Sequence, residues 1–90
     1  MAIGNVGSSL TAELNRLANG GTYPAVSAYL DEQGAANKWA GTTGLSTVGA
    51  LNAKNGVTNR SLFKDIDGVA NALGGTTGLA APAALRLRST

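Results

Sequence analysis

The pentapeptide Gly41-Thr42-Thr43-Gly44-Leu45 occurs a second time in this chain of 90 residues, as Gly75-Thr76-Thr77-Gly78-Leu79. Six further identities share the same offset of 34 residues: Asp31 with Asp65, Gly34 with Gly68, Ala36 with Ala70, Asn37 with Asn71, Ala50 with Ala84, and Leu51 with Leu85. A catalytic site needs different residues that converge on one point, whereas a repeat of this kind is typical of a unit of structure. The sequence therefore predicts a protein built for packing and assembly.

A shorter motif divides the repeat into half-units. Glycine, a small residue, an apolar residue and then asparagine occur at 34–37, 49–52 and 68–71, with a degenerate copy at 12–15. Each copy is followed four or five residues later by a glycine, namely Gly20, Gly41, Gly56 or Gly75. Such a glycine ends a helix in the left-handed conformation, and an asparagine shortly before it can share that role. We therefore expect short helices that each end at a glycine.

The repeated pentapeptide fits a connector between two such helices. Its first glycine ends one helix, and its threonines are natural acceptors for the N-cap of the next. Leu45 and Leu79 would then enter the first turn of the following helix.

The apolar spacing and the glycines predict an all-α fold. Helices are expected at about 8–18, from Pro24 toward Trp39 with a break allowed at Gly34, at 45–54, at 62–73, and at 79–87 with Pro82 in the first turn. Residues 55–61 are expected to form a loop, with Ser61 as a candidate N-cap. The prediction is one domain, 1–90, a small bundle of four to five short helices with internal duplication. Its repeat units are about 31–51 and 65–85, and a more divergent N-terminal unit is about 8–30.

The composition indicates a protein that needs a partner for stability. Small side chains dominate the apolar residues, Gly contributes 13 residues, and only 13% of residues are charged. A domain of this size gains little from its core and usually needs a disulfide, a metal or association. The sequence has no Cys and no His, so association remains, and a homo-oligomer is expected.

Charge and hydropathy argue against two classes of partner, nucleic acids and membranes. The net charge of +2 is spread singly and forms no basic stripe, so no nucleic acid is expected. No apolar stretch approaches the roughly 20 residues of a spanning helix, and residues 1–11 lack the features of a secretory signal, so no membrane is expected.

The polar residues give little support for catalysis. The acidic residues Asp31, Glu32, Asp65 and Asp67 precede or begin expected helices, where negative charge favours the helix dipole. Ser61 with Lys64 is a weak nucleophile pair, and neither Gly-Thr-Thr-Gly copy is followed by the lysine of a phosphate-binding loop. We therefore expect no enzyme, no cofactor and no metal.

Six residues are the candidates for an interface. Trp39 aligns with Leu73 in the repeat, which favours core packing over an exposed anchor. The other aromatic candidates are Tyr23, Tyr29 and Phe63, since aromatic side chains are enriched in interfaces. Arg86 and Arg88 form either a solvated end or an arm that reaches a neighbouring molecule.

The phrases at 14–18, 34–45, 50–54 and 68–73 resemble a module of virion proteins in tailed bacteriophages, particularly those that infect actinobacteria. In that module, Leu-Asn-x-Leu-Ala-Gly-Thr-Thr-Gly-Leu and Gly-Ala-Ala-Asn phrases alternate, and the resemblance covers about residues 10–85. The chain departs from it at 19–24 and 55–59, where other residues replace the connector. The resemblance implies a structural protein of the virion, assembled in the host cytoplasm. It favours a minor capsid or decoration protein that binds the major capsid protein or another virion protein.

Two alternatives stay open from the sequence. The module could instead be an adaptor in the neck, tail or fibre base of the particle. It could also be a small binding protein with no place in the virion.

Overall fold

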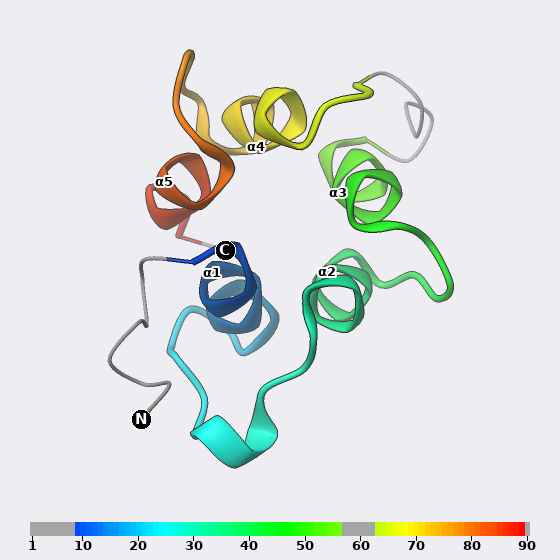
Figure 1. Ribbon diagram of the computed structural model, residues 1–90, viewed down its shortest axis with the longest axis vertical. Coiled ribbons are helices and arrows are strands. Elements are labelled where there is room, and N and C mark those ends of the chain that lie inside the picture. The colour runs from blue at the N-terminus through cyan, green and yellow to red at the C-terminus, as the bar shows by residue number, and fades with distance from the viewer. Residues whose placement is uncertain (1–8, 57–62, 90) are drawn as a thin grey trace.

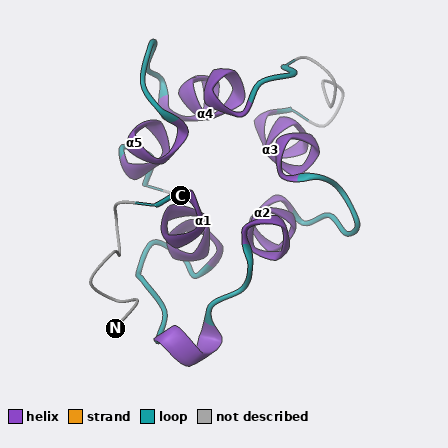
Figure 2. Cartoon of the chain, in the orientation of Figure 1, coloured by secondary structure: helices purple, strands orange, loops and turns teal. Residues whose placement is uncertain are grey.

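The computed structural model describes residues 9–56 and 63–89 of the chain. Figure 1 shows its helices arranged around a ring, and within these residues Figure 2 shows helices and loops but no strand. The helices are α1 (Leu10–Ala18), a 3₁₀ turn (Val26–Ala28), α2 (Glu32–Ala40), α3 (Thr47–Asn55), α4 (Ile66–Gly74) and α5 (Ala81–Arg86). The prediction of a small all-α bundle with four to five short helices is confirmed.

Each helix packs against the next along the chain, and α5 packs against α1, so the ring is closed. Every α-helix contributes buried side chains to one core, most of them Ala, Leu or Val: Leu14, Leu17, Ala35, Ala36, Trp39, Ala50, Leu51, Val69, Ala70, Leu73, Ala81, Ala84 and Leu85. These helices have six to nine residues, which is too short for stability alone in water. Packing around the ring must therefore hold them.

A buried asparagine on each of the first four α-helices binds the backbone of the segment that follows. The side chain of Asn52, which is fully buried, donates to the carbonyl oxygen of Phe63 at 2.8 Å and accepts from the Phe63 N–H at 3.0 Å. Its amide nitrogen also donates to the carbonyl of Val48 in its own helix, at 2.9 Å. We call this set of three hydrogen bonds an asparagine clamp. The four clamps join Asn15 to Leu30, Asn37 to Leu45, Asn52 to Phe63, and Asn71 to Leu79.

The clamp suits asparagine for a chemical reason. The clamped residue lies outside a helix, so its backbone N–H and C=O have no helical partner, and at Leu45, Phe63 and Leu79 the residue also packs against the core. An asparagine amide supplies two donors and an accepting oxygen on a short side chain, which matches that pair of groups. Aspartate has no donor at neutral pH, and leucine has neither donor nor acceptor. The Gly-x-x-Asn motif is therefore explained by a contact between each helix and the next segment.

The repeated connector has the same conformation in both copies. Gly41 and Gly75 end α2 and α4 with φ of 75° and 71°, as expected for glycine at this place. The second glycines, Gly44 and Gly78, also have positive φ, at 74° and 76°. Both glycines of the pentapeptide are thus required by backbone conformation.

The threonines and leucines of the connector have other roles than predicted. Thr42 and Thr76 are not N-caps: each hydroxyl donates to the clamp oxygen of its own repeat, Asn37 or Asn71, at 2.8 Å. Ser46 caps α3 instead, and the N-cap of α5, Ala80, makes no side-chain hydrogen bond. The leucines at 45 and 79 precede the helices, because the clamps hold their backbones outside the helical hydrogen-bond pattern.

The second predicted helix was also wrong in its course. It is divided into the 3₁₀ turn and α2, because the clamp of Asn15 holds Leu30 and the Asp31 carboxylate caps α2. Gly34 lies inside α2, where a Cβ atom would come within 2.8 Å of the Asp31 carboxylate oxygen. Glycine there makes room for the cap. Pro82 lies in the first turn of α5, as predicted, while the expected loop beyond Gly56 and the Ser61 cap fall outside the described residues.

Replacing Asn52 with Ala should lower the free energy of unfolding by about 2–4 kcal/mol, because the partly buried Phe63 N–H and C=O would both lose their partner. Urea denaturation followed by circular dichroism measures the effect. Asn55→Ala is the matched control, because Asn55 is exposed on the same helix, and its change should stay within about 0.5 kcal/mol. Equal urea midpoints for the two variants would contradict a stabilising role for the clamp.

Candidate interaction surface

Trp39 is buried in the core and lies beside two cations. It is 9% exposed and belongs to the core cluster. The Lys54 ammonium is 5.1 Å from the centre of a Trp39 ring, and the Arg88 guanidinium is 5.4 Å from it. Both distances are within cation–π range. Trp39 is therefore already engaged within the chain by α3 and by the C-terminal residues.

Arg88 also connects several helices through hydrogen bonds. Its guanidinium donates to the carbonyl of Leu73 in α4, at 2.9 Å, and its own carbonyl accepts from Arg16 of α1, at 2.7 Å. The two arginines differ in their surroundings: the Arg88 side chain is bonded to α4, whereas the Arg86 side chain is 56% exposed to water. The two arginines do not form one arm in the described structure.

A buried ion pair lies where α1 meets α5. Glu13 is fully buried and accepts a hydrogen bond from the Arg16 side chain at 2.9 Å. Arg16 continues to the carbonyl of Leu85 in α5, at 3.0 Å. The second carboxylate oxygen of Glu13 accepts from the Tyr23 hydroxyl at 2.7 Å and lies 3.9 Å from Arg86. We call these four charged or polar residues, Glu13, Arg16, Tyr23 and Arg86, the closing seam.

The closing seam perturbs the ionisation of its tyrosine. Burial, together with the hydrogen bond and the negative charge of Glu13, raises the pKa of the Tyr23 phenol above its ordinary value of 10.0, while Arg16 and Arg86 act in the opposite direction. The neutral phenol donates to the carboxylate, whereas a phenolate would repel it.

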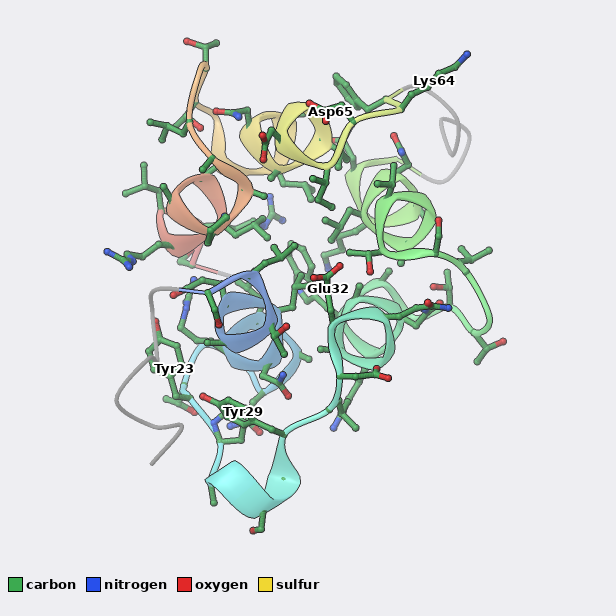
Figure 3. The ribbon with its side chains drawn as sticks, viewed as in Figure 1. Tyr23, Tyr29, Glu32, Lys64 and Asp65 are labelled. Carbon is green, nitrogen blue, oxygen red and sulfur yellow. The ribbon has the colours of Figure 1, made fainter. Side chains whose placement is uncertain are left out.

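The segment between α1 and α2 projects from the ring (Figure 1). Tyr23 and Leu30 belong to this segment and are 36% and 39% exposed. Figure 3 shows Tyr23 and Tyr29 between the projecting turn and α1. We give the name projection surface to Tyr23 and Leu30 of this segment, together with Arg86, which lies 3.9 Å from the Glu13 carboxylate that Tyr23 also binds. It is a candidate contact surface, because it combines exposed apolar side chains with an exposed cation.

The six candidates from the sequence do not gather at one place. Tyr23 and Arg86 lie on the projection surface, whereas Trp39 and Arg88 are joined inside the ring. Phe63 is half-buried against the core, at the residue clamped by Asn52. Tyr29 is half-buried, and its hydroxyl has no hydrogen-bond partner among the described residues.

Sequence reasoning missed Leu30 as an exposed residue and Glu13 with Arg16 as a buried pair. One signal for the pair was present: Glu13 and Arg16 are three residues apart on an otherwise apolar helix face. Arg16 also directly follows a clamp asparagine, Asn15. The other three clamp asparagines are followed by Lys38, Ala53 and Ala72 instead of arginine.

The duplication also produces two equivalent open grooves, of about 590 and 540 Å³. The first lies beside Asp31, Asn37 and Thr42, and the second beside their counterparts Asp65, Asn71 and Thr76. Both donors of each asparagine are already used within its clamp. The grooves are accounted for by the repeated connector and its helix.

Within residues 9–56 and 63–89, no group of three or more acidic side chains is placed to hold a metal ion. Over the same part of the chain, no helix has the length and apolar character needed to cross a membrane.

Comparisons with known proteins give no relative: no family model, no curated protein and no solved structure matches this chain.

The raised pKa of Tyr23 predicts a loss of stability at alkaline pH. Because the folded chain holds the phenol proton more tightly than the unfolded chain, this contribution is present below about pH 10 and is lost as pH rises through the folded pKa. Urea midpoints of the wild type and of Tyr23→Phe, measured from pH 8 to pH 11.5, test it. Phenylalanine removes this titration together with the hydrogen bond to Glu13, so the change of each midpoint with pH is compared rather than its absolute value. The wild type should lose more stability over this range than the variant. Parallel pH profiles would contradict the assignment.

Proposed function

We propose that this chain is a structural, non-enzymatic protein of a tailed-phage virion, and that it is a minor capsid or decoration protein on the outer shell. The observation that carries the proposal is that the repeated residues hold the fold together. The phrases that resemble the virion module contain the clamp asparagines and the connector glycines, which stabilise the fold. These distinctive residues therefore serve a scaffold, and contact with partners is left to the exterior.

The closed ring supports a particular mode of assembly. In an open array of repeats, the end helices present unpaired faces on which a further copy can stack. Here α1 and α5 cover one another through Arg16 and the carbonyl of Leu85. Neighbouring molecules must then be bound through the outer surface of the ring.

The projection surface is the part of that exterior that we assign to the partner. Tyr23 and Leu30 expose apolar area. Arg86 adds an exposed cation, and the acidic side chain beside it, Glu13, is already paired with Arg16. Tyrosine and arginine are enriched among the residues that contribute most to protein binding. A major capsid protein, or another virion protein, repeated by symmetry, would supply many copies of a matching site. A homo-oligomer on the shell would share the same stabilisation.

The copy number of the chain in purified particles tests the proposal. Quantitative mass spectrometry should find on the order of hundreds of copies, as expected for a site repeated over a symmetric shell. About three to twelve copies would instead support a neck, tail or fibre-base adaptor with ring symmetry. Absence from purified virions would support a small binding protein outside the particle.

A binding assay tests the assigned surface with matched variants. Particles that lack the chain are mixed with purified protein, pelleted and analysed for bound protein. Leu30→Asp should weaken binding by about tenfold or more, because it places a charge in an apolar contact. Thr43→Asp adds the same charge at an exposed residue of the connector and should leave binding unchanged. Equal binding by the two variants would overturn the assignment of the projection surface.

A further inference from the structure

Two asparagines in the described structure are followed by glycine: Asn19 before Gly20, and Asn55 before Gly56. An Asn-Gly sequence is open to intramolecular deamidation, because glycine has no Cβ to shield its backbone nitrogen from the asparagine side chain. Both asparagines are exposed to water. The local structure around them, however, is different.

We propose that Asn55 is the site of spontaneous deamidation in the folded protein, and that the fold protects Asn19. The backbone nitrogen of Gly56 attacks the Cγ atom of Asn55, and the Cγ–Nδ2 bond breaks. The proton from the backbone nitrogen leaves with the amide nitrogen as ammonia, and a cyclic imide remains. Water then opens one of the two imide C–N bonds and gives aspartate or isoaspartate. The net reaction consumes one water and releases one ammonia, with no change of oxidation state.

Asn19 is held by hydrogen bonds on both its side chain and its backbone. Its amide nitrogen donates to the carbonyl and the hydroxyl of Thr22, at 2.9 and 3.2 Å. The next two N–H groups, of Gly20 and Gly21, donate to Leu17 and Arg16 at 3.3 and 2.9 Å. Turning the side chain onto the Gly20 nitrogen therefore requires this capping turn to open.

Asn55 lies at the last residue of α3, where helices fray. Among the described residues, one backbone bond restrains the attacking nitrogen: the Gly56 N–H donates to the carbonyl of Asn52 at 3.0 Å. Gly56 has an extended backbone, with φ of 178°, so the chain has already left the helix at this point. Opening the end of α3 is therefore enough to free the reacting nitrogen.

The four clamp asparagines should resist the same reaction. Their amides are buried and hydrogen-bonded on both the nitrogen and the oxygen. They precede residues with a Cβ: Arg16, Lys38, Ala53 and Ala72. The asparagines that stabilise the fold are thus chemically protected by it.

Deamidation would add a negative charge at the C-terminal end of α3, where the helix dipole disfavours one. It would also lower the net charge of the chain from +2 to +1. Lys54, whose ammonium lies over Trp39, is the adjacent residue. Modified chains can therefore be separated by charge and examined through Trp39 fluorescence.

The test uses the full chain incubated at about pH 8.5 and 37 °C, with circular dichroism recorded on the same samples to verify the fold, because native domains are only marginally stable. Tryptic peptides are then analysed by fragmentation mass spectrometry. Cleavage after Arg16, Lys38, Lys54 and Arg60 places the two sites in different peptides. Asn55 should deamidate about tenfold faster than Asn19 in the native protein, because fewer hydrogen bonds must open.

Two controls separate the fold from the local sequence. In urea that unfolds the chain, the two Asn-Gly sites should react at similar rates. Gly56→Ala should slow the reaction at Asn55 and leave the reaction at Asn19 unchanged. The proposal is overturned if Asn19 reacts as fast as Asn55 in the native protein, or if the difference persists in urea.

Discussion

The fold depends on a hydrogen-bonded contact between a buried asparagine and the backbone of one residue in the next segment. Four such clamps recur at Asn15, Asn37, Asn52 and Asn71. Each fixes where the connector leaves one helix and where the chain approaches the next. The helices are short and their apolar side chains are small, so hydrophobic burial alone specifies little of their relative placement. The clamp fixes this placement because its hydrogen bonds are directional: the N–H and the C=O of one residue must both face the same asparagine amide.

The contact between α5 and α1 that closes the ring uses an arginine, whereas the contacts between successive segments use asparagine clamps. At the offset of 34 residues, the counterpart of Asn52 is Arg86, so α5 carries no asparagine at the corresponding position. Closure instead uses Arg16, which bonds to the carbonyls of Leu85 and Arg88 while Glu13 neutralises its charge. Arg88 then extends into the ring toward Trp39. At the seam between the first and last helices, a fully buried carboxylate, that of Glu13, takes part in the fold. The seam also lies beside the projection surface that we propose for partner binding, through the shared residues Tyr23 and Arg86.

The sequence predicted the helices better than the contacts between them. Apolar spacing and glycine positions located the ends of the α-helices well, because both signals are local, but they placed the starts of α2 and α4 too early in the chain. The Gly-x-x-Asn motif also marked the correct asparagines, but their role was not predictable from local rules. Each amide binds a backbone 8 to 15 residues further along the chain. The same limitation explains Thr42 and Thr76, which resemble N-caps but bind the clamp oxygen. It also explains Leu30, whose exposure depends on how the segment before α2 is held. For the candidate surface, Tyr23 and Arg86 were visible as residue types, whereas their common position beside Glu13 follows only from the packing of α1 against α5.

Native-state amide hydrogen exchange, resolved by residue, tests the clamp most directly. We predict slow exchange for the N–H groups of Leu30, Leu45, Phe63 and Leu79, although these residues lie outside the helices, because each donates to a buried asparagine oxygen. The exposed connector residues Thr43 and Thr77 serve as the reference for fast exchange. If the four clamped amides exchanged as fast as this reference, the clamps would not hold the fold in solution.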